Sequence, residues 1–253
     1  MKTIEKSKEK ISFVMESNET MANAIRRSVN EIPVIAIEEV ELHKNDSALY
    51  DEIVSHRIGL IPLKEKRKLN EIENCSCEGK GCNKCQIQLA LKVKGPCTVY
   101  AGDLKGDVEI IYPKIPIVIL EKDQEIELIG FARLGKAVNH AKFSPGLVYY
   151  RNVSEINIKN SDKAEEIIKR LGDHILNPPK GKIKSGEIYK CDKDMDYIET
   201  LTDKENNSIE IKPGKEIIFF IESWGQMAPE EIFNEAVKTL NNNLKEVLKT
   251  VKK

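Results

Sequence analysis

Short stretches of the chain alternate apolar and polar positions between turn residues, which is the pattern of β-strands. Near the N-terminus, Ile11, Phe13 and Met15 alternate with polar partners. We predict strands over residues 10–15, 34–43, 86–93, 98–101, 108–112, 117–120, 126–134, 147–158 and 216–222, the stretch 147–158 being one long strand or a pair. The middle of the chain is therefore expected to be β-rich.

Helical spacing interrupts these strands. The first helix is predicted over residues 19–31, where Met21, Ile25 and Val29 recur every four residues on one face. Pro33 ends it, because the residue before a proline avoids the helical region. Shorter helices are predicted over residues 48–58 and 161–171, the second one stopped by Gly172.

The C-terminal segment predicts a long helix that begins at Pro229, with Glu230 and Glu231 in its first turn. Its apolar positions alternate in spacings of four and three, which is close to a heptad repeat. They are Phe233, Val237, Leu240, Leu244, Val247 and Val251. Such a stripe either covers the chain's own sheet or pairs with a helix of a second chain, and we expect part of it to do each.

Four cysteines lie within eleven residues: Cys75, Cys77, Cys82 and Cys85. Two closely spaced pairs of thiolates can complete a tetrahedral metal site, and Gly79 and Gly81 supply the backbone freedom that such a tight loop needs. Disulfides and reduced spare thiols are the alternatives. The spacing favours a structural zinc site, although sulfur ligands alone also permit iron.

Composition limits the classes of function. Among 253 residues, 40 Lys and Arg nearly balance 41 Asp and Glu, giving a formal charge of -1. A protein that grips nucleic acid by itself normally carries a basic excess, so strong direct nucleic-acid binding is not expected. No apolar stretch follows the first residues, and the most apolar runs are too short to cross a bilayer. Six cysteines without a secretion signal point to a reducing cytoplasm.

No catalytic site is predicted. His56-Arg57 and His140 with Lys142 lack an accompanying nucleophile motif, paired carboxylates or a phosphate-binding loop, so packing or subunit contact is expected of them. Trp224, at the turn before the last helix, is expected to anchor that turn in the core.

Three motifs resemble the α-like subunits of DNA-dependent RNA polymerase, and within that family its archaeal branch. The run from Met21 to Pro33 is similar to the family's "N-A-x-R-R … P" helix, and Ser55 to Leu63 to its "H-R-x-G-L-I-P-L" segment. Ala132 to Gly135, followed by His140 to Pro145, resembles the "A … G … H-A-K" segment. The cysteine loop follows the second motif, as in archaeal and eukaryotic members.

The resemblance implies an α+β fold: a discontinuous α-like dimerisation domain, an inserted β-rich domain with the metal loop, and a small extra α+β (ferredoxin-like) module. The expected limits are 1–50, 147–159 and 214–253 for the dimerisation domain, 51–146 for the inserted domain, and 160–213 for the module.

The resemblance also implies a non-catalytic assembly subunit. It would pair with a small α-like chain (L in archaeal polymerases), and then assemble with the small chains N and P and the large catalytic chain (B). Arg26 and Arg27 are expected at a partner interface, against the alternative of a solvated helix face. An independent iron–sulfur redox protein and a stand-alone zinc-knuckle nucleic-acid binder remain as alternatives from other classes.

Some archaeal members of the family hold an iron–sulfur cluster in the extra module. Here that module contains only Cys191, and one thiolate cannot hold a cluster that needs about four ligands. A cluster in the module is therefore not expected. Cys97, which is close to the metal loop, is expected to be a buried thiol in a strand.

Overall fold

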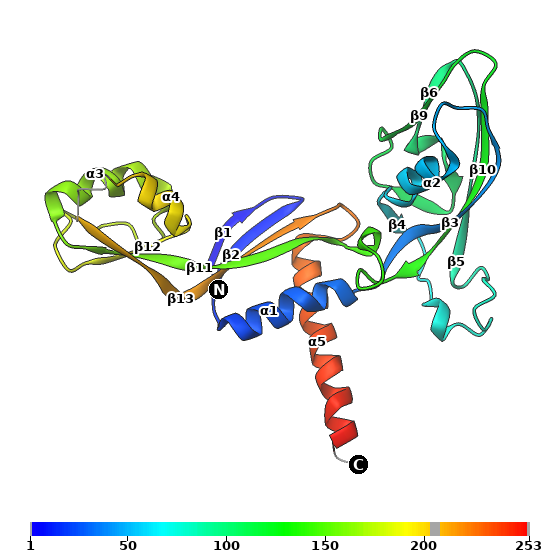
Figure 1. The fold of residues 1–253 in the computed structure, drawn as a ribbon. Coiled ribbons are helices and arrows are strands. Elements are labelled where there is room, and N and C mark those ends of the chain that lie inside the picture. Colours follow the sequence, from blue (N-terminus) through cyan, green and yellow to red (C-terminus); the bar gives the residue numbers. More distant parts are fainter. Residues whose placement is uncertain (1, 203–207, 252–253) are drawn as a thin grey trace. The chain divides into compact units, whose positions relative to one another are not determined.

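The computed structural model describes residues 2–202 and 208–251. Helices and strands are mixed along the chain, which confirms the predicted α+β class (Figure 1). The chain divides into two compact units, one formed by residues 1–26 and 148–221, the other by residues 27–147 and 222–253. This division differs from the expected domain limits, which stay predictions.

The first unit is built on a five-stranded sheet in which strands from both halves of the chain are neighbours. Its order is β1 (Lys2–Lys6), β2 (Lys10–Glu16), β13 (Ile209–Ser223), β11 (Gly146–Ile158) and β12 (Ile188–Cys191). The rings of Phe13 and Phe219 stack with their centroids 5.7 Å apart, and both side chains are buried. Residues 147–158 form one strand, so the single long strand was the correct alternative.

Helix α1 (Glu19–Ser28) continues into a single 3-10 turn over Val29–Glu31. Its first turn is capped by Asn18, whose Oδ1 accepts from the Met21 amide at 2.8 Å. Ile25 is buried as predicted, but Met21 is 48% exposed. A spacing of four advances 40° around a helix, so Met21 falls beyond the edge of the face that Ala22 and Ile25 bury.

The small module packs on the same sheet. Helices α3 (Ser161–Leu171) and α4 (Met195–Thr200) share a buried cluster with Ile156 and Ile158 of β11. Gly172 ends α3 with a φ of 48°. Strand β12 and helix α4 were not predicted. The buried core of the module also includes Ile156 and Ile158, which precede its expected start at residue 160.

The second unit contains a four-stranded sheet in the order β3 (Val34–Asn45), β10 (Glu125–Gly135), β5 (Gln86–Lys94) and β7 (Lys105–Gly106), so β3, which was expected in the dimerisation domain, pairs with a strand expected in the inserted domain. Two smaller sheets pair β4 (Leu63–Glu65) with β8 (Val108–Ile110), and β6 (Cys97–Tyr100) with β9 (Pro116–Leu120). Helix α2 (Asp51–Gly59) contributes Val54 and Ile58 to one large apolar core with these strands. Further 3-10 turns cover Ile72–Asn74, Ala101–Asp103, Ala141–Phe143 and Gly172–His174.

Helix α5 (Pro229–Val251) begins at the predicted proline and runs to the end of the described chain. It buries Pro229, Ile232 and Ala236 near its start and contacts the 3-10 turn Val29–Glu31. Further along, Asn243 Nδ2 donates to Glu31 Oε2 at 2.8 Å. None of the described helices combines the length and apolarity needed to cross a membrane.

The expectation that Trp224 anchors the core is wrong. Its side chain is 41% exposed, while Ser223 beside it is 4% exposed. At the end of β13, Phe219, Ile221 and Ser223 are buried while Phe220 and Glu222 between them are partly exposed, and this alternation directs the next residue outward. The Trp224 amide donates to the Pro145 carbonyl at 3.1 Å, so its backbone fixes the turn instead.

Candidate metal centre and partner-binding helix

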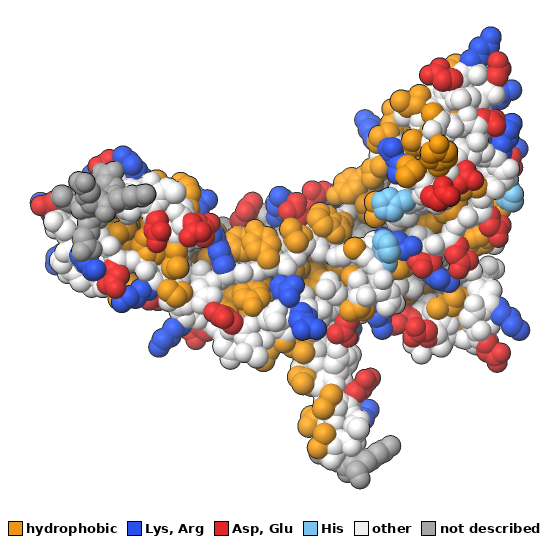
Figure 2. Space-filling model, in the orientation of Figure 1, with side chains coloured by type: hydrophobic (Ala, Val, Ile, Leu, Met, Phe, Trp, Pro, Cys, Tyr) orange, Lys and Arg blue, Asp and Glu red, His pale blue; other side chains and the backbone are white. Residues whose placement is uncertain are grey.

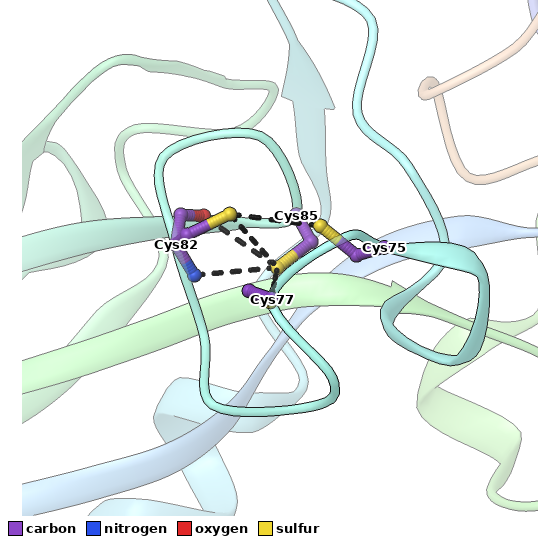
Figure 3. Close-up of side chains that lie close together, drawn as sticks. All are labelled: Cys75, Cys77, Cys82 and Cys85. Atoms are coloured by element: carbon purple, nitrogen blue, oxygen red, sulfur yellow. Dashed lines mark hydrogen bonds between the residues drawn. The ribbon is translucent and has the colours of Figure 1, made fainter.

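The four clustered cysteines converge on one point of the inserted domain, at the loop that leads into β5 (Figure 3). Their Sγ atoms all lie within 4.8 Å of one another. Sγ of Cys75 lies 3.6 Å from that of Cys82, Cys77 lies 3.6 Å from Cys85, and Cys82 lies 3.8 Å from Cys85. The structure therefore brings together all four ligands that the sequence predicted.

These separations fit a metal ion better than disulfides. A zinc ion bound at about 2.3 Å by four tetrahedral thiolates places neighbouring sulfurs roughly 3.8 Å apart. A disulfide needs a separation of about 2.05 Å. The donor set of four thiolates suits a soft or borderline ion, and no fifth residue among those described joins the group.

The backbone of the loop adopts the conformations that its glycines allow. Gly79 has a φ of 83° and Gly81 a φ of 77°. A Cβ added to Gly81 would lie 2.0 Å from Gln86 Oε1, so a side chain there would be both strained and crowded. At the second pair, the Cys82 amide lies 3.3 Å from Cys85 Sγ and donates to it, and the amides of Cys85 and Gln86 donate to the Cys82 carbonyl at 2.9 Å.

The thiols differ in their acidity. For Cys77, burial raises the pKa, but hydrogen bonds from Cys75, Cys85, Cys82 and the backbone of Gly81 outweigh it and lower the pKa to about 7. For Cys85, burial and the neighbouring thiols raise the pKa to about 12, although a hydrogen bond with the Cys82 backbone acts to lower it. Four thiolates this close cannot all be ionised without a compensating charge, which a bound metal ion supplies.

The other two cysteines lie outside this group. Cys97 is in strand β6 as predicted, but it is half-buried and not fully buried; it is the first residue of the strand, whereas Val99 further along is buried. Cys191 is buried at the end of β12, and burial raises the pKa of its thiol. Among the described residues, neither has further cysteines, histidines or carboxylates arranged with it as a metal site.

The predicted stripe of α5 changes from partly buried to exposed along the helix. Phe233, Val237 and Leu240 are half-buried. Further along, Leu244 is 51% exposed, Val247 58% and Val251 77%. Leu248, which widens the stripe, is 57% exposed. The second half of α5 thus presents a continuous apolar face, visible as the orange side chains of the descending helix in Figure 2.

The two arginines of α1 differ in their surroundings. Arg26 is half-buried, and its Nε and Nη2 donate to Asn23 Oδ1 at 3.2 and 2.9 Å. Arg27 is exposed. Part of the Arg26 guanidinium is therefore engaged by its own helix, and the contact of either arginine with a partner stays a prediction.

Residues of the two histidine-containing segments make structural contacts. His140 Nδ1 accepts from the Lys142 amide at 3.1 Å. Lys142 Nζ lies 2.5 Å from Glu38 Oε2, and its side chain is only 12% exposed. Arg57 Nη2 donates to the Pro116 carbonyl at 2.8 Å.

The sequence analysis missed an apolar surface on the inserted domain, which we call the α2–β9 groove. It is bordered by Leu49, Arg57, Thr98 and Pro116–Ile119. Figure 2 shows hydrophobic side chains gathered over α2 and the strands β6 and β9. The strand pattern of residues 117–120 was recognised, but the pattern alone does not tell which edge or face remains uncovered.

Comparison with known proteins agrees with this arrangement. Residues 35–146 match the family model described as the RNA polymerase Rpb3/RpoA insert domain. The chain is 33% identical to the DNA-directed RNA polymerase subunit Rpo3 of Pyrococcus horikoshii, over 95% of this chain and 93% of that protein. It is 34% identical to the Rpo3 subunit of Thermococcus kodakarensis (94% and 92% covered) and 32% identical to that of Methanosphaera stadtmanae (98% and 96% covered). The chain therefore belongs to the Rpo3 family of archaeal α-like subunits, the non-catalytic assembly subunits of DNA-directed RNA polymerase.

Proposed function

We propose that this chain pairs with a small α-like subunit through α5, and that the pair forms the platform on which the large catalytic chain (B) and the small chains N and P assemble. The observation that carries the proposal is the exposed apolar face of α5. Leu244, Val247, Leu248 and Val251 are each more than half exposed on one side of the helix. An apolar face of this length favours burial against a second helix.

Burial of this face contributes a large part of the free energy that pairing requires. Fully burying a Leu or Val side chain contributes about 1.5–3 kcal/mol, so covering these four side chains, each more than half exposed, contributes roughly 4–7 kcal/mol. Phe233, Val237 and Leu240 extend the same stripe toward the start of the helix. Arg26 and Arg27 would add polar contacts, which favour specificity more than affinity.

Within this function the four cysteines hold a structural zinc ion. All four positions of the tetrahedron are taken by protein thiolates, so the site has no open position for substrate or water, as in structural zinc sites. The ion would fix the loop between Leu69 and β5 on the inserted domain. We further propose that the chain works in the cytoplasm, where reduced thiols are maintained.

Co-expression tests the pairing. The chain is produced with the small α-like subunit of an archaeal polymerase, and the complex is measured by size-exclusion chromatography with light scattering. Leu240→Asp combined with Leu244→Asp should abolish the heterodimer, because two charges would enter an apolar seam. Asn242→Ala with Lys249→Ala, on the opposite side of the helix, is the matched control and should leave it intact. Equal complex formation by both double variants would contradict the proposed interface.

Metal analysis separates the alternative functions. Zinc at one ion per chain, with no visible absorption, is expected. A brown protein with iron and visible absorption would support an independent iron–sulfur protein instead. A salt-dependent shift of duplex DNA by the isolated chain would favour the zinc-knuckle nucleic-acid binder.

A further inference from the structure

The α2–β9 groove is mostly apolar and has the volume of a binding site. Its volume is about 400 Å³. Thr98 and Arg57 are the only residues of the lining with polar side chains. A mostly apolar lining with a few polar groups accepts an apolar group and fixes its orientation. Ile119, which lines the groove, is 65% exposed, so part of this apolar lining faces solvent.

Strand β9 borders the groove and has an unpaired edge. Within the described part of the chain, β9 is hydrogen-bonded to β6 and to no other strand. Four consecutive residues of β9, Pro116 to Ile119, contribute to the lining. A strand that is paired along one side only can accept another strand along its other side.

Arg57 gives the groove a positive charge that the lining does not balance. Among the described residues, Arg57 is the one charged residue that borders the groove, and no carboxylate of this part of the chain forms an ion pair with it. Its Nη2 donates to the Pro116 carbonyl at 2.8 Å, which places the guanidinium beside the start of β9. A guanidinium carries five N–H donors in a planar fork, so the remaining donors match a carboxylate.

We propose that an extended, carboxylate-bearing segment of another polymerase subunit docks along β9. Its main chain pairs with the free edge of the strand, an apolar side chain enters the groove, and its carboxylate binds Arg57. Addition of a strand to an open edge gives affinity through main-chain hydrogen bonds, while pockets for side chains give specificity. The inference rests on the proposed assembly function, because the occupant is a segment of a polymerase subunit.

The first experiment maps the occupant in the assembled polymerase. A photo-cross-linking phenylalanine derivative replaces Ile119 in the native host, and polymerase is purified through a tag on its large catalytic chain. Cross-linked peptides from another subunit that are extended and contain Asp, Glu or a terminal carboxylate are the expected result. The same derivative at Val138, which is 64% exposed, is the control for non-specific capture and should give different peptides.

Three outcomes would overturn the inference: no cross-link from position 119, a cross-link to a second copy of this chain, or a cross-link to a helix. If the tagged polymerase chain did not recover this chain at all, the proposed assembly function would itself fail. Recovery of the chain without the cross-link would refute docking at the groove and leave the proposed assembly function standing.

A double-mutant cycle then tests the role of Arg57. A synthetic peptide of the mapped segment is titrated against the full chain by fluorescence anisotropy. Arg57→Gln should weaken binding roughly fivefold, the upper end for an exposed ion pair. A peptide with the carboxylate changed to an amide should bind wild-type and Arg57→Gln chains equally. Thermal unfolding of Arg57→Gln checks that the variant is folded, and an unchanged affinity in a folded variant would refute the assigned carboxylate contact.

Discussion

The loss of two cysteines from the proposed metal site should destabilise the inserted domain and spare the five-stranded sheet. We choose Cys82→Ser with Cys85→Ser, because this pair begins and ends the tight turn before β5 and Cys85 is fully buried. Without these two thiolates the loop has no closed site. When the loop loosens, the neighbouring hydrogen bond from the Asn70 amide to the Lys84 carbonyl, at 2.9 Å, would also break.

The magnitude follows from the length of the closed loop. The span from Cys75 to Cys85 is eleven residues. A cross-link that closes a loop of this size lowers the entropy of the unfolded chain enough to stabilise by about 3 kcal/mol at 25 °C. For a domain of roughly 100 residues, 1 kcal/mol shifts the Tm by about 4 °C or more. The double variant should therefore lower the Tm of the inserted domain by at least about 12 °C.

Calorimetry of the full chain, combined with hydrogen exchange, measures this effect. Peptides from the inserted-domain strands β5 and β10 should lose protection, while peptides from β2 and β13 should keep it. Cys97→Ser, which changes a cysteine outside the group, is the matched control and should shift the Tm by no more than about 4 °C. If the double variant has lost its metal but its inserted domain still unfolds at the wild-type Tm, a structural role for the ion is refuted.

Three other predictions concern packing and pairing. Phe219→Ala removes a fully buried ring and should lower the free energy of unfolding by about 3–5 kcal/mol in urea denaturation. Gly135→Ala should cost about 1–3 kcal/mol by the same assay, because its Cβ would lie 2.5 Å from the ring of Phe143, whereas Gly181→Ala, with nothing within 4 Å, should not. Leu248→Ala should weaken the heterodimer about tenfold by titration while leaving the Tm of the isolated chain unchanged, since this side chain is 57% exposed.

The local chemistry of the chain could be predicted from its sequence. The cysteine spacing identified all four members of the thiol group, since their convergence depends on one loop. Pro229 and the apolar repeat gave the start and length of α5. These features need only neighbouring residues, so no knowledge of the tertiary structure was required.

Features that depend on distant contacts were missed. Strand β1 is mostly polar and exposed, and it becomes a strand only by pairing with β2. Strand β12 is recognised only through its register with β11, where Ser154 pairs with Cys191. The outward direction of Trp224 likewise follows from the alternation of the strand before it, and not from its own hydrophobicity.

The measurement that tests the central claim most directly is purification of this chain, with an affinity tag, from its native host, followed by mass spectrometry of the co-eluting proteins. The account predicts recovery of a small α-like subunit together with the large polymerase chains, each near one copy per copy of this chain. Substitution of Leu240 and Leu244 by Asp should remove all of them at once. Recovery of the wild-type chain alone, or as a homodimer, would contradict the account.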